Sequence, residues 1–113
     1  MTEIDCLMCL SKKTNEYTSG SKLLKSDYSE YFDSILAKEV LVADNARNHP
    51  ATRCFNESYL IPNDIHSMLD YILTKDGSPF GVICCESVGQ KQEWQETDIQ
   101  NLRRIANMSS MFF

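Results

Sequence analysis

The chain has 113 residues, of which 42% are hydrophobic and 24% are charged, and its formal net charge is −5 with both histidines neutral. Its length and composition are those of one globular domain and argue against wholesale disorder. No apolar run approaches the roughly 20 residues that span a bilayer, and no basic block is present to bind nucleic acid or an anionic membrane surface.

The chain is predicted to begin with a β-hairpin. Ile4–Leu10 is a short apolar run that is typical of a strand, and residues 16–24 alternate weakly as its partner. Gly20 within the second strand indicates a bulge or a short strand. Apolar residues at helical spacing then predict a helix over Ser29–Lys38.

Two shorter elements follow this helix. Val40–Ala43 is predicted to be a buried strand that ends at Asp44 and Asn45. Pro50, near a first helical turn, predicts a second helix over Ala51–Tyr59.

A second hairpin and a terminal helix complete the chain. Strands are predicted over Ser67–Thr74 and Phe80–Ser87, joined by a turn at Asp76-Gly77. The last helix is expected from about Glu96 to the end. Its predicted apolar face consists of Ile99, Leu102, Ile105, Ala106, Ser109 and Phe113, widened by Met108, Met111 and Phe112. Its start fits a capping box of Thr97 with Gln100, although Gln95 or Glu96 could also begin the helix. Hairpins at both ends predict an α+β fold with a mostly antiparallel sheet.

The five cysteines are Cys6, Cys9, Cys54, Cys84 and Cys85. An odd count, with no basic segment of a secretory signal at the start, favours a reducing cytoplasm over a disulfide framework. A metal site is disfavoured because no second ligand pair stands at a suitable spacing, and in a regular strand Cys6 and Cys9 would face opposite ways. The cysteines are therefore interpreted as small buried apolar residues.

Several short motifs occur in a familiar order. They are Tyr31-Phe32, Val42-Ala43-Asp44-Asn45-Ala46, Tyr59-Leu60, Ile65-His66-Ser67-Met68-Leu69-Asp70, Gly81-Val82-Ile83-Cys84-Cys85-Glu86, Gly89 and Trp94. In order and spacing they resemble a GAF domain of the kind found in bacterial sensor kinases and diguanylate-cyclase signalling proteins. Two positions depart from the family pattern, Ile72 in place of a proline and Gln95 in place of a threonine, and neither threatens the fold.

The resemblance implies a PAS-related, GAF-like architecture, a central antiparallel sheet of about five strands with helices on both faces. The helix with which GAF domains normally begin is missing, because the chain starts at the first strand. Residues 1–113 are therefore expected to form a single GAF-like domain that belongs to a longer signalling protein.

A small-ligand site is expected between the sheet and the segment from Tyr28 to Pro62, because polar groups at element ends would border an otherwise apolar cavity. Its predicted rim consists of Tyr31, Asp44, Asn45, His66 and Asp70. Asp70 and Glu86, in neighbouring strands, form a candidate carboxylate pair for which structural roles are favoured over ligand contact or catalysis. No catalytic residue, metal or cofactor is predicted.

The resemblance implies a non-enzymatic regulatory sensor that binds a small effector or relays conformation to a fused output domain, such as a kinase or diguanylate cyclase, through its last helix. Two alternatives stay open. One is a structural dimerisation module without ligand, and the other is a cysteine-dependent methionine sulfoxide reductase of the same fold. A homodimer through the last helix is expected because its apolar face exceeds what one side of the sheet can cover.

Two other ligand classes known in the family are disfavoured by the sequence. Cys54 does not stand in the local motifs by which bilin-binding GAF domains attach their pigment, and the residue constellation of cyclic-nucleotide-binding GAF domains is not found in recognisable order. His49 and Cys54 are also poorly aligned for a nucleophilic pair, since five residues on a helix span about 500° of rotation.

Overall fold

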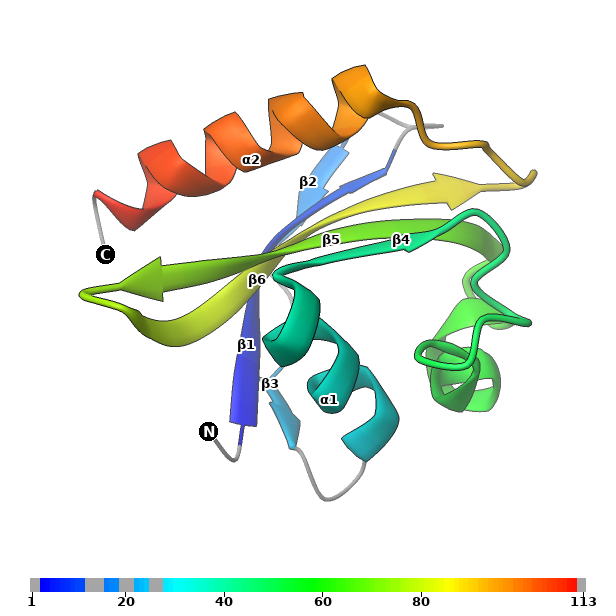
Figure 1. Ribbon diagram of the computed structural model, residues 1–113. Helices are drawn as coiled ribbons and strands as arrows, with labels where there is room; N and C mark the ends of the chain where they lie inside the picture. Colours follow the sequence, from blue (N-terminus) through cyan, green and yellow to red (C-terminus); the bar gives the residue numbers. More distant parts are fainter. Residues whose placement is uncertain (1–2, 12–15, 19–21, 25–27, 112–113) are drawn as a thin grey trace.

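The computed structural model describes residues 3–11, 16–18, 22–24 and 28–111 (Figure 1). Its elements in chain order are β1 (Glu3–Ser11), β2 (Glu16–Thr18), β3 (Lys22–Leu24), α1 (Ser29–Lys38), β4 (Val40–Ala43), η1 (Arg53–Phe55), η2 (Asn56–Leu60), β5 (Ile65–Lys75), β6 (Ser78–Val88) and α2 (Glu96–Ser110). Among these residues, no helix has the length and hydropathy needed to cross a membrane.

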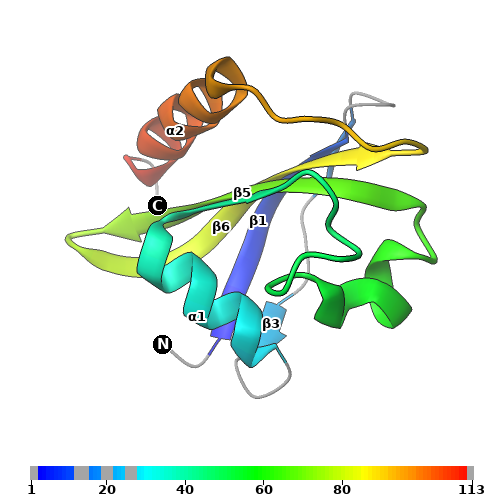
Figure 2. The same ribbon diagram turned by 45° about the vertical axis from the view of Figure 1, so that its right-hand side comes forward.

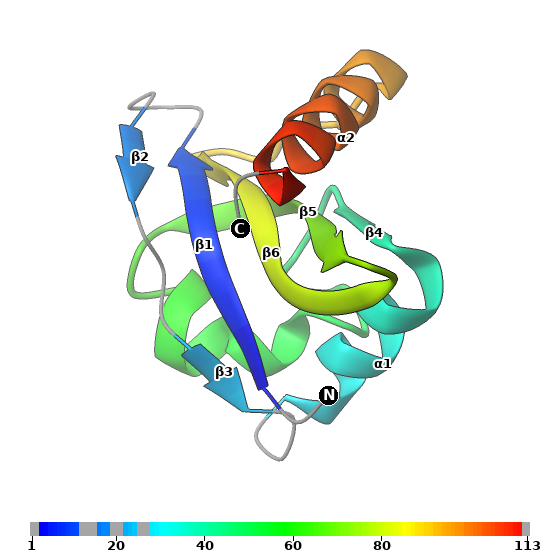
Figure 3. The same cartoon turned by 90° about the vertical axis from the view of Figure 1, so that its left-hand side faces the viewer.

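The described strands form one sheet of six, in the order β2-β1-β6-β5-β4, with β3 also paired with β1. Neighbouring strands are antiparallel except β1 and β6, which run parallel (Figure 3). The sheet is thus mostly antiparallel, as predicted. The one parallel pair consists of the first and the last strand. Parallel strands require a long crossover connection, and the chain between β1 and β6 provides it.

Helices cover both faces of the sheet (Figures 1 and 2). Alternation along the strands divides the buried side chains into two clusters. The cluster under α1, η1 and η2 includes Phe32, Ile35, Phe55, Ile72 and Val82. The cluster under α2 includes Leu69, Ile83, Trp94, Leu102 and Ala106. This two-sided core confirms the expected α+β architecture with a helical layer on each face.

The β5–β6 hairpin lies in the middle of the sheet, as predicted. Its strands pair from Ile65 opposite Val88 to Lys75 opposite Ser78. The two turn residues both have positive φ, 53° at Asp76 and 80° at Gly77, which is the turn geometry that follows the twist of a hairpin. A glycine adopts this backbone conformation at no steric cost.

Replacing Gly77 by alanine is expected to lower the free energy of unfolding by about 1 kcal/mol. The added Cβ would meet no atom within 4 Å, so the cost is the left-handed backbone alone. Urea denaturation measures it. The matched control is Asp76→Gly, which removes a side chain from the neighbouring left-handed position and is expected to leave stability unchanged or slightly raised. Equal stability of Gly77→Ala and the parent chain would contradict this account of the turn.

One predicted element is corrected and another is described in part. The described parts of the expected second strand are β2 and β3, and the expected bulge at Gly20 lies outside the described residues. The helix predicted over Ala51–Tyr59 is instead a 3-10 turn, η1, followed by a π-helical turn, η2. Side chains hold these turns to the preceding loop, because the Thr52 hydroxyl donates to the Ala46 carbonyl at 2.6 Å and the Asn56 amide donates to the Arg47 carbonyl at 2.9 Å. These bonds compete with regular α-helical pairing.

The first strand also departs from the expected regular alternation. Its register with β6 shifts between Cys6 and Met8, so Cys6 pairs with Val82 and Cys9 pairs with Cys84. The prediction that Cys6 and Cys9 occupy opposite faces concerns side chains of β1, which lie outside those that the structure describes.

Helix α2 begins after Gln95, whose backbone N–H donates to Asp98 Oδ2 at 2.9 Å. This is the alternative start considered above, and the Thr97 capping box was wrong. Leu102 and Ala106 are buried on the sheet, whereas three residues of the predicted or widened apolar face are exposed: Ile105 at 37%, Met108 at 59% and Met111 at 80%. A helix lying on a flat sheet touches it along a narrow stripe, so the remaining apolar side chains face outward. Phe112 and Phe113 lie outside the described residues.

Candidate functional site

A buried aspartate and a buried tyrosine meet on the α1 side of the sheet. Asp70, in β5, and Tyr31, in α1, are each 1% exposed. The Tyr31 hydroxyl donates a hydrogen bond to Asp70 Oδ2 at 2.7 Å. Removing a carboxylate from water is costly, so a hydrogen bond from a fixed donor is what makes its burial tolerable.

A second tyrosine and a second carboxylate repeat this arrangement nearby. Glu86, in β6, is 6% exposed, and its Oε2 accepts a hydrogen bond from the hydroxyl of Tyr59 in η2. Asp70 lies opposite Cys84 and Glu86 lies opposite Met68. The two acids are therefore diagonal neighbours on one face of the sheet. Residues at such diagonal positions lie about 7–8 Å apart.

An aromatic group beside the two acids positions the covering layer. The Tyr28 and Phe55 rings stack with centroids 4.5 Å apart, and the Tyr31 ring meets Phe55 edge to face at 5.2 Å. Such contacts fix ring orientation in addition to burying apolar area. We call the four residues Tyr31, Tyr59, Asp70 and Glu86 the polar centre.

The structure brings together two of the five predicted site residues, Tyr31 and Asp70. Asp44 is exposed and holds the segment before α2, because its Oδ1 accepts the Trp94 backbone N–H at 3.0 Å and its carbonyl accepts the Ser67 hydroxyl at 2.6 Å. Asn45 is half-buried, and its carbonyl accepts the Asn48 N–H at 3.2 Å. These contacts tie loops together rather than reaching the polar centre.

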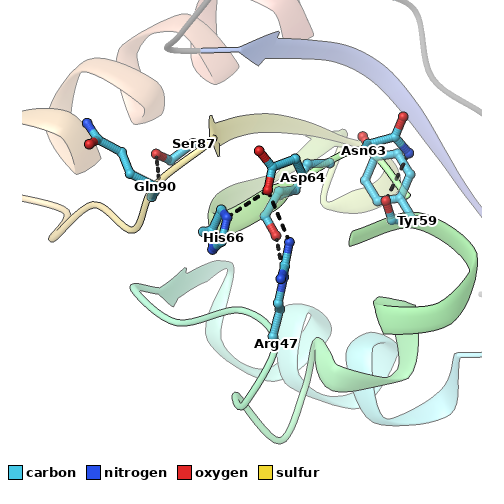
Figure 4. A network of polar contacts seen from close by, with 8 residues as sticks. Arg47, Tyr59, Asn63, Asp64, His66, Ser87 and Gln90 are labelled. Atoms are coloured by element: carbon cyan, nitrogen blue, oxygen red, sulfur yellow. Dashed lines mark hydrogen bonds and ion pairs between the residues drawn. The ribbon is translucent and has the colours of Figure 1, made fainter. Parts of the chain in front are cut away.

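The fifth residue, His66, belongs to a polar cluster at the surface (Figure 4). Its Nε2 lies 2.9 Å from Asp64 Oδ1, and Arg47 approaches the same oxygen at 3.6 Å. The Arg47 Nε also donates to the Ile65 carbonyl at 3.0 Å. Asp64 is well exposed, so these contacts add little stability, and they connect the loop before β5 to Arg47 and His66.

Tyr59 was missed as a site residue by sequence reasoning, and Glu86 was considered only as a partner for Asp70. A signal for Glu86 did exist. In β6 the α1-side positions Val82 and Cys84 are apolar and buried, so a charged residue two positions further along breaks the pattern. Tyr59 belongs to the Tyr59-Leu60 motif of the resemblance, but its contact with Glu86 depends on the π-helical turn, which the sequence did not predict.

The described side chains offer little for metal or thiol chemistry. No group of three His, Cys, Asp or Glu residues among them is arranged to hold a metal ion. Burial raises the pKa of the Cys54 thiol, and Glu30 raises it further, although the local backbone and Arg53 oppose the shift. Burial, followed by the charge of Lys38, lowers the pKa of His49, whose Nδ1 accepts the Ala51 N–H at 3.1 Å.

A mixed sheet with helices on both faces and a polar centre beneath one helical layer defines an α+β domain. The sequence matches the GAF domain family over residues 6–111. The chain therefore belongs to the GAF domain family, and this confirms the resemblance. No curated protein sequence matches the chain.

Solved structures with the same fold differ widely in function. The cyanobacteriochrome receptor PixJ has a TM-score of 0.65 at 16% identity, over 82% of this chain and 62% of that one. The type II free methionine-R-sulfoxide reductase of Thermoplasma acidophilum has a TM-score of 0.60 at 15% identity, over 83% and 64%. The GAF domain of cyanobacteriochrome TePixJ has a TM-score of 0.61 at 14% identity, over 97% and 76%. The chain thus spans less than two thirds of the first two proteins, and at these identities the likeness concerns the fold alone.

Proposed function

We propose that this chain is a regulatory sensor module that binds a small effector at the polar centre and transmits the change to an output domain through α2. The observation that carries the proposal is the pair of buried carboxylates on adjacent central strands, each bonded to a tyrosine of the covering layer. A few polar groups in an otherwise apolar layer can fix the orientation of a small ligand. The same groups contribute little to stability, because apolar residues at these positions would stabilise the fold about equally well.

The path to the output runs through β5. Asp70 faces α1, and its neighbours Leu69 and Tyr71 face α2. Tyr71 also accepts a hydrogen bond from Arg103 Nε in α2, at 3.2 Å. A shift of β5 that accompanies ligand binding would therefore change the seating of α2, which is the kind of differential contact that a coupled system requires.

The exposed residues of α2 support the same role. Ile105, Met108 and Met111 recur every three residues along the outward side of the helix. We propose that this stripe pairs with a second copy of the chain, and that the helix leads into a fused kinase or cyclase domain in the cytoplasm. The alternative of a dimerisation module without ligand keeps this pairing of α2. It differs from the proposal in giving the polar centre only a structural role.

Catalysis as a methionine sulfoxide reductase is the second candidate, favoured by the likeness to the Thermoplasma acidophilum enzyme. It requires a thiol with a lowered pKa in an accessible position. Cys54 is exposed but has a raised pKa, and Cys84 is buried in the strand interior. These features support a non-enzymatic module.

Hydrogen exchange in α2 tests the relay without knowledge of the effector. Asp70→Asn is expected to change the rate of amide hydrogen exchange in residues 96–110 as well as in β5. The substitution alters the polar centre, and the proposal links that centre to α2 through β5. Two controls separate relay from general weakening. Asp33→Asn changes an exposed carboxylate of α1, and Gly77→Ala weakens the fold away from the centre. Exchange in α2 that changes no more in Asp70→Asn than in Gly77→Ala would refute the relay.

Two further measurements separate the alternatives. Free methionine-R-sulfoxide with dithiothreitol should show no turnover, and measurable turnover lost in a cysteine variant would establish the enzyme.

Sedimentation should show a dimer of the parent chain. The double variant Met108→Ser with Met111→Ser should dissociate it, while Lys91→Ser, a change at an exposed position before α2, should leave the dimer intact. A monomeric parent chain at micromolar concentration would contradict pairing through α2.

A further inference from the structure

Helix α2 carries two exposed methionines on the side that faces away from the sheet. Met108 is 59% exposed and Met111 is 80% exposed, and Ile105, which precedes Met108 by three residues, is 37% exposed. No element of the described chain lies over this side of the helix (Figures 1 and 3). We call Ile105, Met108 and Met111 the outward stripe. Two of its three side chains are therefore thioethers that solvent can reach.

A third methionine whose side chain the structure describes is protected by the fold. Met68 lies in β5, is 5% exposed and packs in the cluster under α1. Oxidation of a side chain in a folded protein follows its accessibility. A reagent in solution therefore reaches Met108 and Met111 directly, whereas it reaches Met68 only when the sheet opens.

We propose that Met108 and Met111 form an oxidation site for hydroperoxides, and that their sulfoxides turn the outward stripe from an apolar surface into a polar one. The thioether sulfur of each residue attacks one oxygen of the peroxide, so the O–O bond breaks and an S–O bond forms. The hydrogen on the transferred oxygen passes to the departing oxygen, which leaves as water or an alcohol. The sulfur loses two electrons and the peroxide gains them.

The seating of α2 on the sheet does not depend on the outward stripe. Leu102 and Ala106, each 2% exposed, face the sheet, and Arg103 Nε donates to the Tyr71 hydroxyl of β5 at 3.2 Å. A sulfoxide on the outward side is solvated by water and disturbs none of these contacts. We therefore expect oxidation to change the surface of α2 while the melting temperature of the single chain stays the same.

The consequence for pairing rests on the proposed function, whereas the oxidation site itself does not. A methionine sulfoxide is polar, so burying it against a second copy would remove a polar group from water without a hydrogen-bond partner. The oxidised chain should therefore be a monomer. Because pairing covers both thioethers, oxidation proceeds through the dissociated chain, in which Met108 and Met111 are exposed.

Peptide mapping of the full chain tests the oxidation site. Trypsin places Met68 in residues 54–75 and both methionines of α2 in residues 105–113. The dilute folded chain is treated with hydrogen peroxide, quenched with catalase at intervals, and reduced with dithiothreitol, which returns disulfides to thiols and leaves methionine sulfoxide in place. The peptide of residues 105–113 should gain oxygen at least about tenfold faster than the Met68 peptide, in proportion to the exposed fractions. In urea the two rates should become similar, and equal rates in the folded chain would overturn the site.

Sedimentation of the same samples tests the change of surface. The matched control is Met108→Leu with Met111→Leu, which keeps the stripe apolar and cannot form a sulfoxide. The oxidised parent chain should be a monomer, and the leucine variant should remain a dimer after the same treatment. A parent chain that stays dimeric with both methionines oxidised would overturn the proposal.

A parent chain that is monomeric before treatment contradicts the pairing in the proposed function instead. Hydrophobic-interaction chromatography then decides the further inference, because retention reports the apolar surface of a single chain. The oxidised parent chain should elute earlier than the untreated one, and the leucine variant should not shift. Equal retention of the oxidised and untreated parent chains would show that the sulfoxides leave the surface of α2 unchanged.

Discussion

Replacing Trp94 by alanine is expected to lower the free energy of unfolding by about 3–5 kcal/mol. Trp94 is 6% exposed and packs in the cluster between the sheet and α2. The surrounding chain is held independently of the indole ring, because the Trp94 N–H donates to Asp44 and the Gln92 N–H donates to the Ser67 hydroxyl at 2.7 Å. These bonds hinder collapse into the space that the ring leaves, so a cavity should remain.

Urea unfolding followed by far-ultraviolet circular dichroism measures this loss, since Trp94 is the only tryptophan and its fluorescence disappears with the substitution. Trp94→Phe retains an aromatic ring and should have a smaller effect. Glu93→Ala, at the exposed neighbouring position, should change stability by no more than about 0.5 kcal/mol. An alanine variant as stable as Glu93→Ala would show that Trp94 does not hold α2 to the sheet.

Replacing Tyr31 by phenylalanine is expected to lower the free energy of unfolding by about 1–3 kcal/mol. The change removes one hydroxyl and keeps the ring with its edge contact to Phe55. Asp70 Oδ2 then loses a donor in a place where water cannot readily replace it, because both residues are 1% exposed. Tyr28→Phe is the matched control, since it removes a hydroxyl from a half-buried ring stacked on the same Phe55.

A double-mutant cycle assigns the loss to the Tyr31–Asp70 pair. In an Asp70→Asn background the same Tyr31 substitution should have a smaller effect, because a hydrogen bond to a neutral amide is weaker than one to a carboxylate. Thermal or urea unfolding of the four chains provides the numbers. Equal losses in the two backgrounds would mean that the hydroxyl stabilises the protein by some other contact.

Half of the polar centre could be anticipated from the sequence. Tyr31 and Asp70 were placed at the rim of the expected site because polar residues at element ends often border a ligand, and the contact between them is observed. Asp44, Asn45 and His66 were placed there for the same reason. Their observed bonds instead tie the β4–η1 loop to β5 and to the segment before α2. End-of-strand polarity cannot distinguish these two uses, since both call for side chains that bond to backbone groups.

The sequence by itself determined the elements whose signals are local. Helix α1, strand β4 and the β5–β6 hairpin were predicted from the spacing of apolar residues and from the Asp76-Gly77 turn. Both signals depend on residues only a few positions apart. The same local reasoning failed over residues 51–59, where hydrogen bonds from Thr52 and Asn56 to the preceding loop impose 3-10 and π turns.

Only the tertiary structure decided what depends on register. The parallel pairing of β1 with β6 joins segments far apart in the chain, and its register shifts at a bulge between Cys6 and Met8 that leaves no mark in the apolar pattern. The diagonal placement of Asp70 and Glu86 likewise depends on the register shift between Leu73 and Thr74, since a slip of one residue would move one acid to the opposite face. Such shifts depend on contacts that form only when the whole sheet has folded.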